Sequence, residues 1–168
     1  QRGTLALALR VVPFRVRTLE ELGCPAACDT LLNKPYGIVL VVGPTGSGKS
    51  TTLAAMIDRI NDTKPLHILT IEDPVEYVHH HKVAMVNQRE VGTDVETFQS
   101  GLKSALREDP DVVLLGEMRD LESMEISLSL AETGHLVFAT LHTNDAAQAL
   151  DRIIDVFPSE RRDQIQIM

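Results

Sequence analysis

The fold is decided by the stretch "GIVLVVGPTGSGKST" at residues 37–51. An uninterrupted apolar run leads into a glycine-rich loop that matches the pattern G-x-x-x-x-G-K-[ST] at Gly43, Gly48, Lys49 and Ser50. Glycines let backbone N–H groups converge on phosphate oxygens, and the N-terminus of the following helix adds positive potential. A strand, a loop and a helix in this order therefore predict a site for a nucleoside triphosphate.

Nine consecutive residues make up the predicted phosphate-binding loop. We expect Lys49 to reach the terminal phosphates and the hydroxyl of Ser50 to bind Mg²⁺. The nucleotide-binding residues predicted are Gly43, Pro44, Thr45, Gly46, Ser47, Gly48, Lys49, Ser50 and Thr51.

The composition is that of an ordinary globular protein. Of the 168 residues, 43% are hydrophobic and 24% are charged, which disfavours disordered and fibrous classes. No apolar run approaches the ~20 residues of a membrane-spanning helix, and no charged-then-apolar leader opens the chain, so we expect a cytoplasmic protein without membrane insertion. A net charge of −8 has the wrong sign for holding nucleic acid through its phosphates, so no nucleic-acid partner is expected.

Short apolar runs alternate with helical patterns from residue 37 onward. Runs that are apolar throughout are typical of parallel strands whose two faces are both covered by helices. The pattern therefore predicts an α/β fold, a mostly parallel twisted sheet with helices on both faces. The strands expected are 37–42, 67–71, 83–87, 112–116 and 136–140, and the helices expected are 49 to about 61, 98–106, 121–131 and a stripe that follows the caps Asn144 and Asp145.

Both ends of the chain are expected to be truncated. The stretch at 4–12 alternates as a strand does, but no neighbouring strand is in view to pair with it. Thr18 and Glu21 have the spacing of a capping box, so we expect a short helix that begins there, is interrupted at 23–25 and then resumes. Near the other end, Pro158 can open a helix that has barely begun when the chain stops.

Acidic side chains follow two of the predicted strands. Glu117 comes directly after one of them, where an acid in this fold class orients Mg²⁺ or the attacking water. Glu72, Asp73 and Glu76 follow another. Because the carboxyl ends of strands in an open α/β sheet face the ligand crevice, one of these three can act as a general base.

Four motifs in order resemble those of the secretion and pilus motor ATPases, a RecA-like class of P-loop NTPases. They are "GPTGSGKST", "TIEDPVEY" (70–77, the Asp box of that family), "REDPDVVLLGEMRD" (107–120, its Walker B region) and "ETGHLVFATLHTN" (132–144, its His box). The resemblance covers nearly the whole chain. "QREVGTD" (88–94) and "DRIIDVFPSERR" (151–162) are more similar to the pilus retraction branch than to the assembly or type II secretion branches.

The resemblance implies a hexameric ring that hydrolyses ATP between neighbouring subunits, with Mg²⁺ as cofactor. By motif position, Lys49 and Ser50 hold phosphate and Mg²⁺. Glu76 is the first choice for the base that polarises water, and Glu117 orients Mg²⁺ or its water, although the two glutamates can exchange roles. In the retraction branch, such a ring powers type IV pilus retraction and twitching motility.

Histidines and arginines of the shared motifs complete the implied site. His135 and His142 fall on the two His-box positions, where they would sense the terminal phosphate or couple it to movement, unless they are core histidines bonded to backbone. Arg89, Arg107 and Arg119 each lie in a shared motif, and any one can cross a subunit interface as an arginine finger. Such fingers contribute ~10³–10⁵ in rate.

The resemblance also implies a domain organisation and partners. Residues 1–17 would be the remnant of an N-terminal PAS-like domain, 18–36 a linker with a short helix, and 37–168 the RecA-like core with incomplete C-terminal helices. The partners implied are other copies of the chain in a homo-hexamer and an inner-membrane platform protein of a pilus or secretion machine. The protein would lie at the inner face of the cytoplasmic membrane. The run His79 to His81 lies outside the motifs and is predicted to be a solvated loop.

Other functions remain open at this point. An assembly ATPase or a type II or type IV secretion ATPase of the same superfamily would share the motifs. A small-molecule kinase would share the glycine loop but would not account for the acidic box and the two histidines, and the absence of an N-K-x-D motif disfavours a GTPase. From another class, the chain could be a nucleotide-gated interaction module that binds ATP without turnover. The candidate base and magnesium acid argue against such a module.

Overall fold

Five strands form one parallel sheet in the order β1-β5-β4-β2-β3 in the computed structural model, which describes residue 7, residues 15–143 and residues 145–167. Nearly all of the strand expected at 4–12, and the cap expected at Asn144, lie outside these residues. The parallel sheet predicted from the apolar runs is confirmed. The strands are β1 (Gly37–Val42), β2 (His67–Glu72), β3 (Met85–Glu90), β4 (Val112–Leu115) and β5 (Leu136–Leu141).

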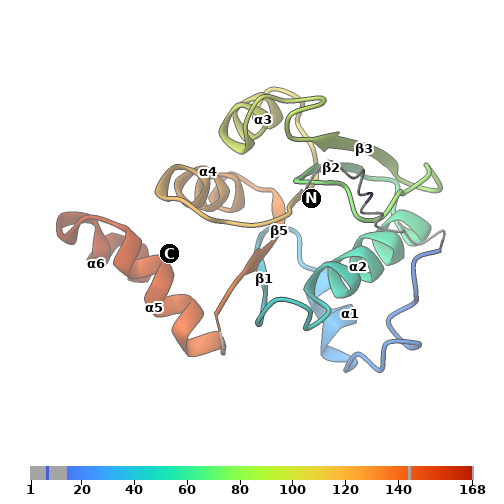
Figure 1. Cartoon of the computed structure of the whole chain (residues 1–168), viewed down its shortest axis with the longest axis horizontal. Helices are drawn as coiled ribbons and strands as arrows, with labels where there is room; N and C mark the ends of the chain where they lie inside the picture. Colours follow the sequence, from blue (N-terminus) through green and yellow to red (C-terminus); the bar gives the residue numbers. More distant parts are fainter. Residues whose placement is uncertain (1–6, 8–14, 144, 168) are drawn as a thin grey trace.

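Helices cover both faces of the sheet, as predicted. In Figure 1, α1 and α2 lie on one side of the strands and α3 and α4 on the other, while α5 and α6 extend from the end of β5. The helices are α1 (Ala27–Leu32), α2 (Lys49–Thr63), α3 (Phe98–Ala105), α4 (Leu121–Glu132), α5 (Ala146–Val156) and α6 (Ser159–Ile167).

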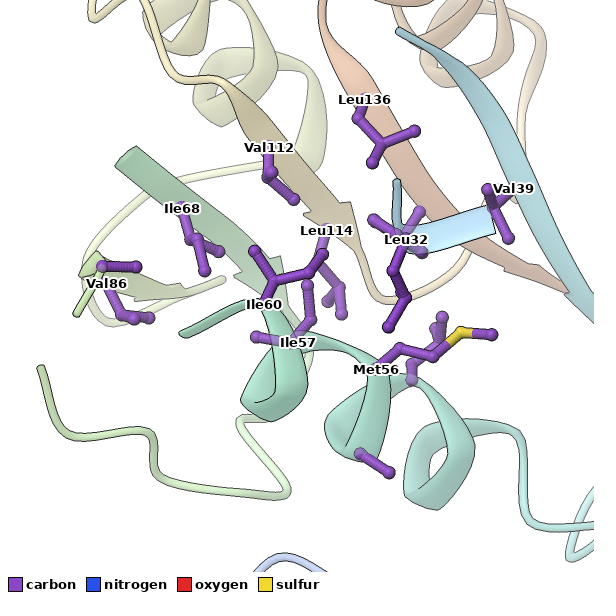
Figure 2. Close-up of a cluster of buried hydrophobic side chains, with 14 of the residues drawn as sticks. Leu32, Val39, Met56, Ile57, Ile60, Ile68, Val86, Val112, Leu114 and Leu136 are labelled. Carbon is purple, nitrogen blue, oxygen red and sulfur yellow. The ribbon is translucent and has the colours of Figure 1, made fainter. Parts of the chain in front are cut away.

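Two apolar cores, one on each face, follow from the alternation of side chains along the strands. In β4, Val112 and Leu114 point into the core beneath α2, whereas Val113 and Leu115 point into the core beneath α3, α4 and α5. Figure 2 shows the first of these cores, with Ile57 of α2 packed against the sheet. Because both faces of β4 and β5 are buried, these central strands are almost entirely apolar, whereas β3 at the edge of the sheet is largely polar.

Side-chain caps fix where three of the helices begin. The side chain of Thr97 accepts a hydrogen bond from the backbone of Ser100, and Asp120 and Asp145 make the corresponding bonds for α4 and α5. Such caps satisfy N–H groups that have no partner within the helix. Asp145 was among the predicted caps, and α6 begins directly after Pro158, as expected.

Two local predictions are corrected by the structure. Thr18 and Glu21 make both capping-box bonds, at 3.2 and 3.0 Å, but only turns follow, and the first helix begins at Ala27. The strand expected from residue 83 begins at Met85, because the N–H groups of residues 83 and 84 donate to the backbone oxygen of Asn61 instead of a neighbouring strand.

The segment at 18–36, expected to be a linker, packs onto the core. Leu19 and Leu32 are each 3% exposed and belong to the apolar cluster beneath α2. The domain boundaries expected at residues 17 and 36 stay a prediction.

We expect Ile57→Ala to lower the free energy of unfolding by about 2–5 kcal/mol, because Ile57 is fully buried between α2 and the sheet. Leu150→Ala is the matched control, since Leu150 is 59% exposed on α5 and should change the free energy by less than about 0.5 kcal/mol. Denaturant unfolding of both variants measures the difference. Equal effects would show that the core is not packed as described.

Candidate functional site

A cavity of about 680 Å³ opens at the carboxyl ends of β2, β4 and β5, beside the loop that follows β1. This edge is where open parallel sheets bind ligands. The predicted site residues that line it are Thr45, Gly46, Gly48, Lys49, Ser50, Thr51, Glu72, Asp73, Glu76, Glu117, Arg119 and His142.

The phosphate-binding loop adopts a backbone that depends on glycine. Gly43 has φ +151°, and a Cβ placed on it would lie 2.6 Å from the Oγ atom of Ser47. Gly48 has φ +94° and forms the N-cap of α2, where a side chain would strain the left-handed conformation. The loop therefore turns tightly enough to aim its own N–H groups and the start of α2 at the cavity.

Lys49 is buried at the base of this loop, with 9% of the residue exposed. Its Nζ atom donates to the backbone oxygens of Gly43 at 2.9 Å and Pro44 at 3.1 Å. The two carbonyls carry no negative charge, so the ammonium group remains attractive to an anion in the cavity. The predicted reach of Lys49 to the terminal phosphates stays a prediction.

Glu117 connects the end of β4 to the phosphate-binding loop. Arg119 donates from Nε to one carboxylate oxygen of Glu117 at 2.8 Å, and the Nε2 atom of His142 lies 3.5 Å from the other. The Nδ1 atom of His142 lies 3.4 Å from the hydroxyl of Thr45. His142 therefore lies between Glu117, the candidate magnesium acid, and Thr45 of the predicted phosphate-binding loop.

Glu72 and Glu76 face the cavity from different settings. Glu72 ends β2, and its carboxylate accepts hydrogen bonds from the hydroxyl of Thr70 at 2.7 Å and the amide of Gln88 at 3.1 Å. Burial raises the pKa of Glu72, and these hydrogen bonds only partly oppose that effect. Glu76 is half-buried on the irregular segment after β2, where it lines the cavity. The assignment of the base to Glu76 stays a prediction.

Gly43, Pro44 and Ser47 of the loop are not among the lining residues, and three predicted side chains elsewhere lie away from the cavity. His135 precedes β5 at the opposite edge of the sheet, with its Nδ1 atom 3.0 Å from the backbone oxygen of Leu130. Arg89 donates to Glu108 at 2.8 Å, and Arg107 is exposed in the turn after α3. Within one chain the structure does not bring these three side chains to the phosphate-binding loop, and their roles stay predictions.

Tyr77 and His79 are among the cavity-lining residues that sequence reasoning did not assign to the site. Tyr77 pairs its hydroxyl with that of Thr51 at 2.9 Å, which ties the segment after β2 to the first turn of α2. The solvated loop predicted for residues 79–81 is wrong for His79, whose side chain is 4% exposed and lines the cavity, although His80 and His81 are exposed. Three consecutive histidines carry no signal that separates the buried one from its neighbours.

The residues present fit the magnesium ion that the motifs imply. Ser50 and Glu117 offer hydroxyl and carboxylate oxygens, which Mg²⁺ prefers, and it usually takes only one or two protein ligands beside water and phosphate. The described part of the chain holds no group of three or more His, Cys, Asp or Glu side chains that could hold a metal ion by themselves. Within the same described residues, no helix has the length and apolar character needed to cross a membrane.

The profile of the type II/IV secretion system protein family matches residues 6–162. The chain belongs to this family. Its sequence is 57% identical over 99% of its length to the type IV pilus retraction ATPase PilT of Pseudomonas aeruginosa, and 55% identical over 99% of its length to a twitching motility protein of Neisseria gonorrhoeae. The resemblance inferred from the four motifs is thereby confirmed.

A solved structure agrees with the fold. A crystal structure of the pilus retraction motor PilT with bound ADP superposes with a TM-score of 0.93 at 55% identity, over 94% of this chain and 46% of that one. The expected RecA-like α/β fold is confirmed. The chain spans 48% of the Pseudomonas protein and 44% of the Neisseria protein, so it corresponds to about half of each of these curated relatives.

We expect Lys49→Ala to weaken ATP binding by about 10- to 100-fold, since it removes charge-assisted hydrogen bonds to phosphate. Lys34→Ala is the control, because Lys34 is exposed and does not line the cavity. Isothermal titration with ATP measures both. Equal affinity of the Lys49 variant and the unaltered chain would exclude this loop as the phosphate site.

Proposed function

We propose that this chain is the nucleotide-hydrolysing core of a ring-shaped motor ATPase that powers type IV pilus retraction. The observation that carries the proposal is the single cavity in which the phosphate-binding loop, Glu76, Glu117 and His142 meet. Its likeness to a pilus retraction motor over nearly its whole length supports the choice among motor ATPases.

Binding of ATP begins at the phosphate-binding loop. The β- and γ-phosphates take hydrogen bonds from the loop N–H groups and from the start of α2, where the helix dipole favours negative charge. Lys49 turns its ammonium group from the loop carbonyls to the terminal phosphates. Ser50 and Glu117 would hold Mg²⁺, which would supply positive charge to balance the charge that develops on the phosphate oxygens.

Hydrolysis is assigned to the two glutamates. Glu76 accepts a proton from the attacking water at its carboxylate, and Glu117 is oriented by its hydrogen bond from Arg119 and its 3.5 Å contact with His142. His142, in reach of both Glu117 and Thr45, responds to whether the terminal phosphate is present. This arrangement links the chemical state of the nucleotide to the end of β5 and so to α5.

In the proposed ring, an arginine of a neighbouring subunit completes the active site. Arg107 is exposed, which leaves it able to meet the nucleotide of a neighbouring subunit, and Arg119 lies at the open mouth of the cavity with 59% of its side chain exposed. We assign the full-length protein to a homo-hexamer at the cytoplasmic face of the inner membrane, docked on a pilus platform protein. Residues 37–168 form its ATPase core, preceded by the linker at 18–36.

We expect Glu76→Gln in the full-length protein to lower ATP turnover by about 10²- to 10⁴-fold with nearly unchanged ATP affinity, because the amide cannot accept the proton from water. Glu96→Gln makes the same chemical change at an exposed position and should leave turnover unaltered. Steady-state phosphate release together with nucleotide titration separates the two quantities. Full turnover in the Glu76 variant would remove Glu76 from the role of base.

The direction of force is tested in cells that make the full-length protein. Loss of retraction leaves pili on the surface but stops surface movement, so we expect Glu76→Gln cells to carry at least as many pili as before and not to move. Electron microscopy counts the pili, and expansion of the colony edge measures movement. Cells without pili would assign the motor to assembly, and unchanged movement with normal pili would remove the chain from pilus function.

A further inference from the structure

The segment at 73–84, here the Glu76 loop, joins β2 to β3 without forming a helix or a strand. Glu76 therefore lies outside the strand ladders, and its backbone forms a hydrogen bond with the carboxylate of Glu72 instead. What holds the loop is a set of contacts with α2 and β3, and these contacts decide where the carboxylate of Glu76 lies.

The far half of the loop is fastened to the C-terminal end of α2 by Asn61, which is fully buried. Its side chain donates to the backbone oxygen of His80 at 2.8 Å and accepts from the N–H of Lys82 at 3.2 Å. Its backbone oxygen accepts from Val83 and Ala84 at 2.9 and 3.1 Å. Four hydrogen bonds to one residue fix this half of the loop.

The near half is held chiefly from β3, beginning with the N–H of Val75, which donates to the carboxylate of Glu90 at 3.0 Å. Gln88 of β3 donates to the backbone oxygen of Tyr77 at 2.8 Å and accepts from the N–H of His79 at 2.7 Å. The hydroxyl of Tyr77 meets Thr51 in the first turn of α2. Side-chain contact between the near half of the loop and the middle of α2 comes from His79.

His79 lies between the loop and α2 with 4% of its side chain exposed, and its Nδ1 atom is 3.6 Å from a carboxylate oxygen of Asp58. That distance is too long for a hydrogen bond, and among the described residues this Nδ1 atom is a buried nitrogen without a hydrogen-bond partner. The same carboxylate oxygen accepts from the ammonium of Lys82 at 2.8 Å. These two charged groups are the ones that face the imidazole.

A buried nitrogen without a partner costs stability, and replacing it by an apolar group of similar shape is neutral or favourable. Burial also lowers the pKa of His79, against the opposing influence of Asp58, so the ring is neutral near pH 7 and can carry its proton on Nδ1. As a packing residue alone, histidine is a poor choice at this position.

We propose that His79 is a positioning residue for Glu76: its Nδ1–H donates to Asp58 when nucleotide fills the cavity, and this bond holds the Glu76 loop against α2. The inference rests on the proposed function and deepens it. His79 and Thr51 both line the cavity, and α2 begins at the phosphate-binding residues, so an occupant in contact with both walls draws them together. Closing 3.6 Å to a charge-assisted bond of ~2.8 Å needs a shift of less than about 1 Å.

The test uses the full-length protein with His79→Leu, which keeps an apolar body of similar size and removes both ring nitrogens, and His79→Asn, whose amide donates from near the position of Nδ1. We expect His79→Leu to leave the melting temperature unchanged or higher and to leave KM for ATP within about twofold. It should lower kcat by about 10- to 100-fold, because a small misplacement of a catalytic group lowers the rate by about this factor. His79→Asn should recover much of kcat. His80→Ala, a change of an exposed neighbouring ring, is the control and should match the unaltered protein.

Amide hydrogen exchange gives a readout that is independent of turnover. A non-hydrolysable ATP analogue with Mg²⁺ should slow exchange in residues 75–80 of the unaltered protein and of His79→Asn, but not of His79→Leu. The proposal is overturned if His79→Leu retains kcat within twofold, or if the analogue protects the loop equally in the Leu variant. Absence of hydrolysis in the unaltered protein would count against the proposed function instead, and the exchange result would still decide the role of His79.

Discussion

Parallel pairing of β1, β5, β4 and β2 is the constraint on which the site depends. Because these strands run in the same direction, their carboxyl ends meet at one edge, and segments far apart in the chain converge there. The loop at 43–48, Glu76, Glu117 and His142 are separated by up to about a hundred positions in sequence yet line one cavity. Burial of the sheet between two apolar cores keeps that edge in place.

Around this edge, some polar contacts are closed hydrogen bonds and others are longer than a hydrogen bond. Glu117 is bonded to Arg119 and approached by His142, which links it to Thr45 of the phosphate-binding loop. The Glu76 loop is fastened by Asn61 at one half, while the contact of His79 with Asp58 is left open at 3.6 Å. In the proposed function, closing this contact would draw the Glu76 loop toward α2 when nucleotide binds, while the phosphate-binding loop stays in place.

Much of the fold could be predicted from the sequence, because the signals are local. Several signals depend only on residues that are close in sequence, and all of them appear in the structure. They are the apolar strands of four to six residues, the glycine loop and the helix starts at Asp145 and Pro158. The capping box at Thr18 failed as a helix signal because its two hydrogen bonds also stabilise an isolated turn. The start of β3 was misplaced because Asn61, distant in sequence, takes the N–H groups of the two preceding residues.

The site residues that belong to sequence motifs could be predicted. The positions of the other site residues depend on tertiary packing. The phosphate-binding loop and the acids after strands could be located from order and spacing alone. The burial of His79 against α2 could not be predicted, because its neighbours in sequence are also histidines. Only the path of the loop determines which of the three side chains is buried. The sequence gives a weak indication of the role of Asn61. It is a polar residue one turn after Ile57 on the apolar face of α2, where a buried polar side chain needs a hydrogen-bond partner.

Phosphate release from ATP, measured against protein concentration in the full-length protein with Lys49→Ala as the blank, tests the central claim most directly. If active sites are completed between subunits of a ring, the rate per subunit rises with concentration and then levels off. A rate per subunit that is constant from the lowest concentration would mean a self-contained enzyme. No release above the blank at any concentration would mean that this cavity binds nucleotide without turning it over.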